Sequence, residues 1–344
     1  MHLTGVALLV TIKHIAEHLG VAVSTVGRAL SGNPRISRAT RDKVNAAARE
    51  LGYVAHSAAR QMRGQRSTLV GLVIPDVLND FYSTAAQAIS QSFDDAGFQM
   101  VLCISDDRPP VELRQVRSLA EARVAGIVVV PSLAPLPETV ELLAQTPHVQ
   151  LIRHYPRLRS DWFGLDDEAT TYEATRHLIG LGHRRIAYFG GPRELSTGAA
   201  RLRGYLKACQ DGAVPVSPEL VFCDVQNVEN GRQAVQLLLR VMPPATGVVT
   251  ATARGTQGVL EGLRASNVAV PEAMSIVGFN DTPALSWWGP GLTTMRLPVR
   301  EIAIACCSLL LRRIVATPGD TLSDPPQHAA YASTLMERGS TRAP

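Results

Sequence analysis

The sequence lacks long apolar segments. None of its runs approaches the ~20 consecutive apolar residues that a membrane-spanning helix needs. The first nine residues, MHLTGVALL, are apolar, but they have neither a basic start nor a small-residue cleavage site. We therefore expect no membrane partner, no secretory signal peptide and a cytoplasmic location.

Cysteine is scarce, with five residues in a chain of 344. Their spacing matches no metal-binding pattern, so no metal site is predicted, and reduced thiols fit a cytoplasmic protein best. The adjacent Cys306 and Cys307 are expected to lie on a helix as small apolar side chains. Composition is otherwise ordinary for globular proteins, with 46% hydrophobic residues, and the length suffices for two or three domains.

Catalytic motifs are absent too. The sequence contains no nucleophile elbow, P-loop or zinc-protease helix. His183 is a candidate base, but a histidine between Gly182 and Arg184 at a turn is more often structural than catalytic. We therefore predict no enzymatic activity and no cofactor.

What the sequence does contain is a helix-turn-helix pattern over residues 10–35, which read VTIKHIAEHLGVAVSTVGRALSGNPR. Helical spacing of apolar residues predicts a first helix over residues 12–19, with Thr11 as its N-cap. Gly20 follows at a position that favours positive φ, and a short turn leads to a second helix over residues 23–30. The apolar residues expected to face inward are Ile12, Ile15, Ala16, Leu19, Val26, Ala29 and Leu30.

The second helix of this pattern is suited to contact DNA. Its small first residues allow close approach to a groove, and Arg28 can reach guanine or phosphate. Two helices joined at a glycine also occur in unrelated proteins, so their surroundings matter. Ser37 is expected to cap a third helix that ends near Gly52, and three helices can bury one small core. The residues expected to face DNA are Thr11, Val23, Ser24, Thr25, Arg28 and Arg35.

Positive charge is concentrated at the same end of the chain. Residues 1–66 contain ten Lys and Arg against three Asp and Glu, a net charge of +7, whereas the whole chain carries +4. Residues 67–344 therefore have a net charge of −3. Phosphate binding requires such a basic excess, so the charge distribution favours a DNA-binding region at the start of the chain.

From residue 69 onward, short apolar runs alternate with stretches long enough for helices. This alternation is typical of parallel sheets covered by helices on both faces, and eight or more strands suggest two such sheets. The expected strands are residues 69–74, 99–104, 126–130, 148–152, 185–190, 219–223, 247–251 and 274–279. The expected helices include residues 82–96, 111–123, 168–181, 199–210, 229–240 and 256–265.

The start of the chain resembles the LacI family of bacterial repressors, which typically begins V-T-x-x-D-V-A-x-x-A-G-V-S-x-x-T-V-S-R-x-x-N. The matching residues are Val10-Thr11, Ile15-Ala16, Gly20-Val21, Thr25-Val26 and Arg28. The departures are His14, Ala22, Gly27 and Ser31. Ala22 removes an N-cap hydroxyl and Gly27 lowers helix propensity by about 1 kcal/mol, so these departures affect operator affinity more than the fold.

Further matches to the family run through most of the chain, at residues 76–82, 181–187, 270–279 and 290–294. The resemblance implies an all-α helix-turn-helix head, followed by two doubly wound parallel-sheet α/β subdomains like those of periplasmic binding proteins. The chain is expected to cross between these subdomains near residues 165, 295 and 325. The implied domains are residues 10–56, 57–66 and 67–340, with an N-subdomain at about 67–165 and 296–325 and a C-subdomain at about 166–295 and 326–340.

The segment between head and core has two interpretations. The resemblance implies a hinge helix near residues 57–64 that orders on operator DNA, with Met62 as an apolar wedge in the minor groove. A plain interdomain linker is the alternative.

A concave site between two α/β subdomains is the default ligand cleft. The resemblance implies that Arg201 clamps an effector, with a structural ion pair as the alternative. At residues 152, 253 and 280 the family's usual carboxylates are replaced, which predicts a less neutralised Arg201 and an anionic effector such as a sugar acid or sugar phosphate. A pocket no longer under selection would look similar. The implied effector-binding residues are Asn79, Phe81, Tyr82, Ile152, Arg201, Thr252 and Asn280.

The first functional hypothesis is a sequence-specific DNA-binding regulator, a repressor of carbohydrate or related catabolic genes that responds to a small-molecule effector. A homodimer is expected, because palindromic double-stranded operators require two-fold symmetry. The alternative is a sugar-binding protein of the periplasmic type without a DNA-binding role. The missing signal peptide and the basic three-helix head argue against that alternative.

Overall fold

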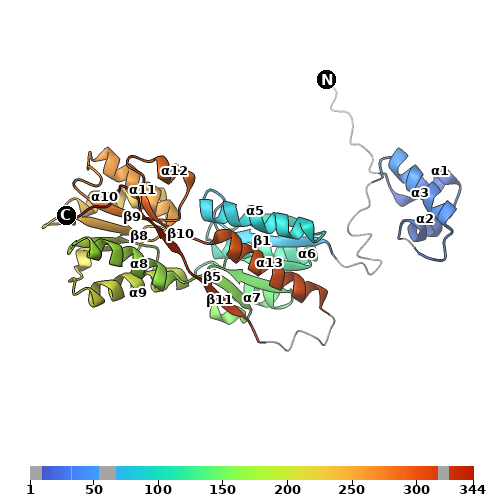
Figure 1. Cartoon of the computed structure of the whole chain (residues 1–344). Helices are drawn as coiled ribbons and strands as arrows, with labels where there is room; N and C mark the ends of the chain where they lie inside the picture. Colours follow the sequence, from blue (N-terminus) through green and yellow to red (C-terminus); the bar gives the residue numbers. More distant parts are fainter. Residues whose placement is uncertain (1–9, 32, 54–66, 317–324) are drawn as a thin grey trace, which may run out of the picture. The chain divides into compact units, whose positions relative to one another are not determined.

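The computed structural model describes residues 10–31, 33–53, 67–316 and 325–344. They divide into two compact units, Met1–Ser67 and Thr68–Pro344 (Figure 1). Each unit has an apolar core of its own.

The first unit contains three described helices, α1 (Ile12–Leu19), α2 (Val23–Leu30) and α3 (Arg38–Glu50). The bounds of α1 and α2 are those predicted from apolar periodicity. Their apolar faces meet in one small core, whose buried members are Ile15, Ala16, Val26, Ala29, Val44, Ala47 and Ala48. The helix-turn-helix and its third helix are therefore confirmed.

The ends of these helices follow from single residues. Thr11 occupies the N-cap position of α1, and Gly20 ends the helix with a φ of 63°, a conformation that favours glycine. Ser37 caps α3, because its hydroxyl accepts a hydrogen bond from the Thr40 N–H at 3.2 Å. Ala22 stands at the N-cap of α2 and offers no side-chain acceptor. The helix that the sequence assigns to DNA therefore begins without a side-chain cap.

Gly27 lies inside α2, and a Cβ added there would meet no atom within 4 Å. Gly27→Ala is expected to stabilise α2 by about 0.5–1 kcal/mol, because alanine loses less backbone entropy than glycine on forming a helix. Hydrogen exchange of the α2 amides in the whole protein measures this effect. Gly20→Ala is the control and should destabilise the unit, because alanine is strained at a φ of 63°. A gain from both substitutions would contradict the backbone argument.

The second unit contains two six-stranded sheets. Sheet A has the order β11-β5-β4-β3-β1-β2, and its strand pairs are all parallel. Sheet B has the order β12-β10-β9-β8-β6-β7 and is parallel except for the antiparallel pair of β10 with β12. The strands of sheet A are β1 (Leu69–Ile74), β2 (Gln99–Ile104), β3 (Gly126–Val129), β4 (His148–Leu151), β5 (Asp161–Leu165) and β11 (His328–Tyr331). The strands of sheet B are β6 (Ile186–Phe189), β7 (Val221–Phe222), β8 (Gly247–Thr250), β9 (Ser275–Phe279), β10 (Thr293–Arg296) and β12 (Thr334–Met336).

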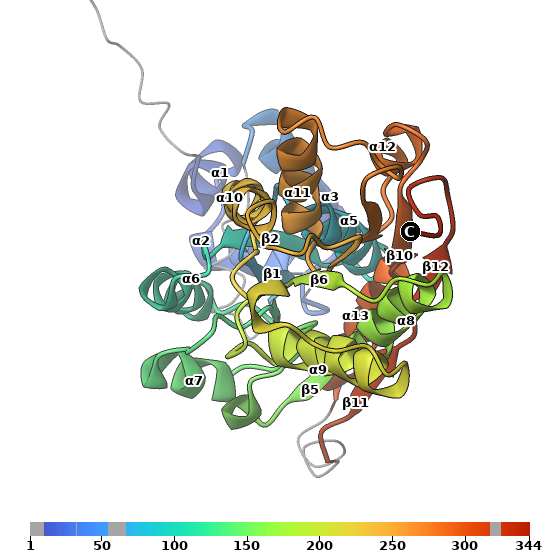
Figure 2. The ribbon, with the colours of Figure 1, turned by 90° about the vertical axis from the view of Figure 1, so that its left-hand side faces the viewer.

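Helices cover both faces of each sheet, as the alternating pattern predicted. We call sheet A with its helices the N-lobe and sheet B with its helices the C-lobe. In the C-lobe, α8 packs with α9 on one face and α10 with α11 on the other (Figure 2). The N-lobe helices are α5 (Asp80–Asp95), α6 (Pro109–Glu121), α7 (Pro137–Ala144), η1 (Pro156–Leu158) and α13 (Val299–Val315). The C-lobe helices are α8 (Asp167–Gly180), α9 (Ser196–Asp211), η2 (Pro218–Leu220), α10 (Val228–Leu238), α11 (Ala253–Ala265) and α12 (Pro283–Trp287).

The eight predicted strands are all present, although β7 is reduced to two residues. Four further strands, β5, β10, β11 and β12, were not predicted. Their sequences, DWFGL, TTMR, HAAY and TLM, contain no long apolar run. Pairing with a neighbouring strand therefore determines these segments more than their own apolar pattern does.

The chain passes between the lobes after β5, between β10 and α13, and between β11 and β12. The third passage was expected near residue 325, with residues 326–340 in the C-subdomain. That expectation is wrong for the first of these residues, because His328–Tyr331 still pair with β5 in sheet A. The passage lies at residues 332 and 333, directly before β12 joins sheet B.

No helix within the described ranges combines the length and the apolar character needed to cross a bilayer. All five cysteines are free thiols, and Cys306 and Cys307 are buried on α13, as predicted for small apolar side chains.

Candidate functional site

The predicted DNA-facing residues lie on the outer side of the helix-turn-helix. Val23, at the start of α2, is 39% exposed although it is apolar. Thr11, Ser24, Arg28 and Arg35 are also exposed, whereas Thr25 is half-buried. Met62 and the expected hinge helix lie outside the described residues.

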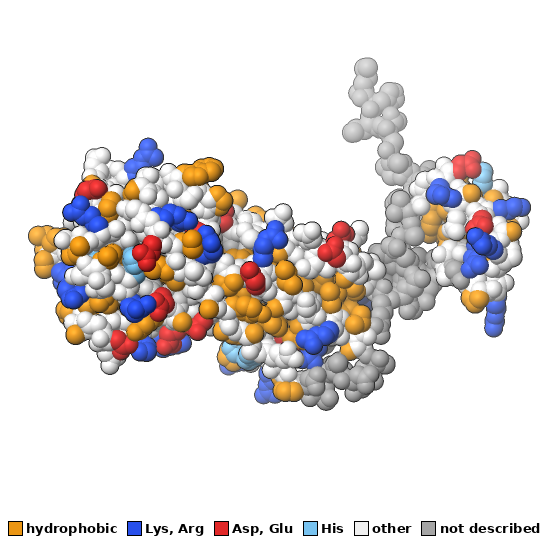
Figure 3. All heavy atoms as spheres, viewed as in Figure 1, with side chains coloured by type: hydrophobic (Ala, Val, Ile, Leu, Met, Phe, Trp, Pro, Cys, Tyr) orange, Lys and Arg blue, Asp and Glu red, His pale blue; other side chains and the backbone are white. Residues whose placement is uncertain are grey.

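Basic side chains dominate this unit. Residues 10–53 contain seven Lys and Arg against three Asp and Glu. Six of the seven are exposed and Arg41 is half-buried, and Figure 3 shows several of them on one face. The described part of the unit therefore retains the electrostatic character that phosphate binding needs.

His14 has a definite role in the structure. Its Nδ1 accepts a hydrogen bond from the Thr11 N–H at 3.2 Å, in the first turn of α1. A carboxylate at this third helical position commonly caps the same N–H. The histidine therefore replaces the usual aspartate as an acceptor, and the departure noted in the sequence leaves this cap in place.

A cavity of about 380 Å³ lies between the two lobes. It is formed by loops and helix starts at the carboxyl ends of the parallel strands, where open α/β sheets bind ligands. The predicted effector residues all line this one cavity: Asn79, Phe81, Tyr82 and Ile152 from the N-lobe, and Arg201, Thr252 and Asn280 from the C-lobe. The structure thus brings together residues as far apart in the chain as Asn79 and Asn280.

Two of these side chains, Asn79 and Thr252, already make hydrogen bonds that cap helices. The Asn79 side-chain oxygen accepts from the Phe81 N–H at 3.1 Å and caps α5. The Thr252 hydroxyl donates to the Val225 carbonyl at 2.6 Å and accepts from the Gly255 N–H at 3.2 Å, which caps α11. Asn280 follows β9 with a φ of 72° and is 6% exposed. Asn280, for whose side chain no hydrogen bond within the described residues is recorded, therefore has more capacity to bind a ligand than Asn79 and Thr252.

Arg201, on α9, is held from three sides. Its Nε donates to Asp167 Oδ1 at 2.6 Å, its Nη1 donates to the Ala251 carbonyl at 2.8 Å, and its guanidinium lies 4.2 Å from the centre of the Phe279 ring. Burial raises the pKa of the Asp167 carboxyl, and Arg201 opposes that shift. The expectation of a less neutralised Arg201 is therefore wrong. Asp167 comes from the start of α8, outside the three positions on which that expectation rested.

Sequence reasoning missed a second cleft arginine. Arg153 is 11% exposed and pairs with both carboxylate oxygens of Asp107, from the loop after β2. Burial by itself lowers the pKa of the guanidinium, but the acidic groups around it, among them Asp107 and Glu112, outweigh burial and raise it, so Arg153 stays charged. Consecutive aspartates directly after a parallel strand were the signal that could have identified this loop.

All three arginines in the cleft lining face a carboxylate. Asp106 adds one further carboxylate to the lining, so this group of charges has no positive excess. The charge argument for a sugar acid or sugar phosphate therefore fails. The pairs are Arg153 with Asp107, Arg201 with Asp167, and Arg254 with Asp76, the last at 3.7 Å.

Aromatic rings supply part of the apolar wall. Phe81 and Tyr82 meet edge to face with ring centres 5.4 Å apart. Burial raises the pKa of the Tyr82 hydroxyl, which therefore keeps its proton and can donate to a ligand. A cleft that combines such rings with amides and paired charges suits a polar, uncharged molecule.

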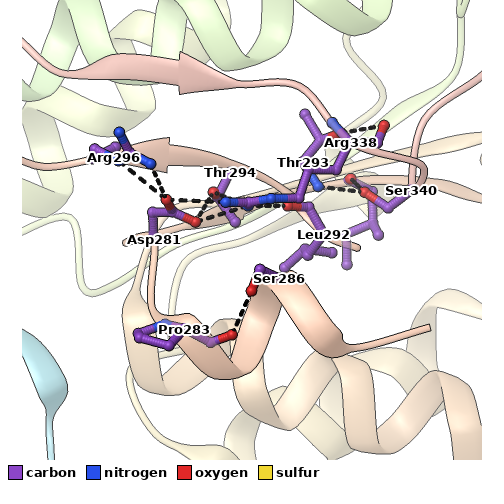
Figure 4. A network of polar contacts seen from close by, with 10 residues as sticks. Asp281, Pro283, Ser286, Leu292, Thr293, Thr294, Arg296, Arg338 and Ser340 are labelled. Carbon is purple, nitrogen blue, oxygen red and sulfur yellow. Dashed lines mark hydrogen bonds and ion pairs between the residues drawn. The ribbon is translucent and has the colours of Figure 1, made fainter. Parts of the chain in front are cut away.

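Asp281, next to the cleft residue Asn280, is the centre of a polar network (Figure 4). Its carboxylate accepts from Arg338 Nη1 at 2.8 Å, from the Thr294 hydroxyl at 2.8 Å and from Arg296 Nη2 at 3.1 Å. Asp281 is 6% exposed, whereas Arg296 is 55% exposed. The network ties the loop after β9 to β10 and to the segment after β12.

His183 is structural, as predicted. Its ring is buried between the Thr246 hydroxyl, 2.8 Å from Nδ1, and the Arg342 carbonyl, 2.9 Å from Nε2. The imidazole connects the turn after α8 to the last residues of the chain.

Comparison with known proteins identifies both units. Residues 11–56 match the bacterial regulatory proteins of the lacI family, and residues 175–341 match the periplasmic binding protein-like domain. The chain is 30% identical to the HTH-type transcriptional regulator DegA of Bacillus subtilis, over 85% of this chain and 88% of DegA. It is also 30% identical to the HTH-type transcriptional regulator GalR of Salmonella typhimurium, over 98% of this chain and 97% of GalR.

Solved structures of transcriptional regulators share the fold of this chain. A cellobiose complex of the transcriptional regulator CelR is 28% identical, with a TM-score of 0.71 over 96% of this chain and all of CelR. A lac repressor dimer bound to operator shares the fold, with a TM-score of 0.81 and 24% identity over 98% of this chain and all of that chain. The predicted fold and family are confirmed: the chain belongs to the LacI family and is a DNA-binding transcriptional regulator.

Proposed function

We propose that this regulator is an operator-binding repressor whose affinity for DNA is set by an uncharged, hydroxyl-rich small molecule in the cleft. The observation that carries the proposal is the cavity lined from both lobes, with every lining arginine already paired. The relatives named above are regulators rather than enzymes, which supports a binding role for the cleft.

The chemistry of the cleft supports a carbohydrate of one or two rings. A volume of about 380 Å³ lies within the range of small-molecule sites. Amide and guanidinium donors can bind hydroxyl oxygens, and the Phe81 and Tyr82 rings can pack against the apolar face of a sugar. The similar regulator CelR was solved as its cellobiose complex.

Because both lobes line the cleft, a ligand there can control operator affinity. A ligand that contacts both lobes stabilises one relative arrangement of them, and it shifts the equilibrium only by its difference in affinity for the two arrangements. The segment at residues 57–66 connects the core to the DNA-binding unit at residues 10–56, and we propose that it transmits this shift. A homodimer in the cytoplasm, bound to a palindromic operator, completes the proposal.

On DNA, we propose that α2 lies in the major groove. Arg28 reads a base, while Thr11 and Arg35 contact phosphates, and Val23, Ser24 and Thr25 approach base edges. Met62 is the proposed minor-groove wedge.

Arg28→Ala tests the DNA-binding half of the proposal. Operator affinity should fall by about 1–3 kcal/mol, and selectivity at one operator position should relax, because a bidentate arginine–guanine contact is lost. Fluorescence anisotropy with the DNA upstream of the gene, and with variants at each position, measures both quantities. Arg49→Ala is the control, because Arg49 is exposed on α3 and its Nε is bonded to the Asn45 carbonyl. Equal losses from the two substitutions, with selectivity unchanged, would assign Arg28 to phosphate contact only.

A titration with neutral sugars tests the effector half. At least one should change operator affinity while leaving binding to random DNA unchanged. A change in operator affinity with sugar acids or sugar phosphates alone would contradict the proposal of an uncharged effector.

A further inference from the structure

The N-lobe wall of the cleft carries donors where the family pattern led us to expect a carboxylate. Ile152, at the expected carboxylate position, has a φ of 61°, which is rare for a β-branched residue. The following Arg153 N–H donates back to the Leu151 carbonyl at 2.7 Å, so the chain turns sharply at the end of β4. This strained turn places Arg153 in the cleft lining.

Asp107 holds one edge of the Arg153 guanidinium. The Nη2 atom donates to Asp107 Oδ2 at 2.8 Å, and the Nη1 atom donates to Asp107 Oδ1 and, at 3.2 Å, to the Pro131 carbonyl. A guanidinium has five N–H donors, and these contacts use three of them, both hydrogens of Nη1 and one hydrogen of Nη2. Within the described part of the chain, no acceptor is recorded for the Nε–H or for the second Nη2 hydrogen. Those two N–H bonds form the side edge of the fork and are parallel to one another.

Tyr82 adds a third donor to the same wall. Its side chain is 8% exposed and lines the cavity, and no acceptor within the described residues is recorded for its hydroxyl. None of these donors is among the fully buried atoms without a partner in the described part of the chain, so they are open to the cavity that both residues line. We infer that this wall offers the side edge of Arg153 and the Tyr82 O–H to a ligand.

The charges around Arg153 decide which acceptor fits. Asp107 already neutralises the guanidinium, and Asp106 lines the same cavity. The buried Glu112, which accepts from the Ser132 N–H at 2.6 Å, is close enough to act on the charge of Arg153. A ligand carboxylate would add a negative charge close to these groups, which is unfavourable in a partly buried site. A neutral carbonyl oxygen accepts from the same donors without that repulsion, and its two lone pairs match two parallel N–H bonds.

We propose that Arg153 is a specificity-determining residue of the cleft, and that it selects an uncharged ligand carrying a carbonyl oxygen. This inference rests on the proposed function, because it assigns the ligand class of the same cleft. An acetamido sugar and a nucleoside both supply a neutral carbonyl beside a hydroxyl-rich ring, so the test includes one of each.

The test is calorimetric titration of the full-length protein with four probes: N-acetyl-D-glucosamine, uridine, D-glucose and D-glucuronate. At least one carbonyl-bearing neutral probe should bind about tenfold to a hundredfold more tightly than glucose and glucuronate, the effect of about two extra hydrogen bonds. The acetamido arm and the nucleoside arm identify the source of the carbonyl. Tighter binding of glucose or glucuronate, or no binding of either carbonyl probe, overturns the proposal.

Three variants locate the selectivity. Arg153→Met should remove the preference for the carbonyl probe, whereas Arg176→Met, on an exposed arginine of α8 that is 64% exposed, should keep it. Residue 107 has a positive φ of 57°, which asparagine tolerates. Asp107→Asn removes one negative charge from the wall, so it should improve glucuronate binding relative to the carbonyl probe. A preference that survives in Arg153→Met assigns selectivity elsewhere and overturns the proposal.

Failure of the proposed function is distinguishable from failure of this inference. Operator binding by the ligand-free protein, measured on the same samples, shows that each variant is folded. Selective binding of a carbonyl probe without any effect on operator affinity would leave the inference standing and overturn effector control.

Discussion

Asp281→Ala is expected to lower the free energy of unfolding of the core by about 3 kcal/mol. The substitution removes the acceptor of Arg338, Thr294 and Arg296 and leaves Arg338, which is 20% exposed, without its counter-charge. Breaking a buried ion pair by deleting one partner costs about 3–5 kcal/mol, and the lower end applies here because Arg296 is half-exposed and can be hydrated. Urea unfolding of the two proteins measures the difference.

The control for this substitution is Asp211→Ala. Asp211 also accepts hydrogen bonds from a cation, Lys207, and from Tyr172, but it lies on the surface of α9. Its removal should change stability little, because exposed pairs are screened by solvent. Equal effects from Asp281→Ala and Asp211→Ala would show that the network around Asp281 contributes no more than a surface pair.

The contribution of Asp281 should depend on pH. Burial by itself raises the pKa of this carboxyl, but hydrogen bonds from Arg338, Thr294 and Arg296 outweigh it and hold the pKa below its ordinary value. A carboxyl with a lowered pKa stabilises the fold fully above the ordinary aspartate pKa of about 4, and that stabilisation is lost as the pH falls through the lowered value. The difference in unfolding free energy between the wild type and Asp281→Ala should therefore shrink in acid.

The helix-turn-helix could be predicted from sequence almost residue by residue. Ile15 and Val26 are buried at helical spacing, and Gly20 has the positive φ that its position required. Local interactions determine these features, because each helix end depends on residues within four positions of it. The same is true of β1 and β2, whose apolar runs have the bounds of the observed strands.

Four strands, β5, β10, β11 and β12, could not be predicted in this way. Residues 328–331 and 334–336 have ordinary composition, and they become strands only because β5 and β10 offer partners across more than 35 positions of sequence. Because residues 328–331 pair in sheet A and residues 334–336 in sheet B, the third passage between the lobes lies at residues 332 and 333, later in the chain than expected. Long-range backbone pairing leaves little trace in a local pattern.

The positions of the cleft residues could be predicted, but the charge balance of the cleft could not. Family resemblance identified seven lining residues, and the same comparison showed carboxylates missing at three positions. It gave no information about Asp167 and Asp107, which come from other elements and supply the missing charge. Counting charges at aligned positions fails whenever a counter-charge enters from a different part of the fold.

The Asp167–Arg201 pair allows a direct test of that balance. Asp167→Ala should destabilise the ligand-free core by about 3–5 kcal/mol, because it leaves Arg201, which is 11% exposed, without a counter-charge. A ligand carboxylate could then replace the missing charge. D-glucuronate should therefore raise the melting temperature of Asp167→Ala more than that of the wild type, in which Asp167 already occupies that role. A larger rise in the melting temperature of the wild type would support an anionic effector and contradict the argument from charge balance.

The converse variant, Arg201→Met, should reveal the other half of the pair through its pH dependence. Burial raises the pKa of Asp167 and Arg201 opposes this shift, so the pKa should rise further once the guanidinium is gone. A carboxyl whose pKa is raised in the folded state binds more protons there than in the unfolded chain, so stability should fall as the pH rises above about 4. The double variant Arg201→Met with Asp167→Ala removes both charges, so it leaves no buried charge unpaired. It should therefore lose less stability than the sum of the two single losses. Urea unfolding between acid and neutral pH measures all four proteins, and strictly additive losses would mean that the two residues act independently.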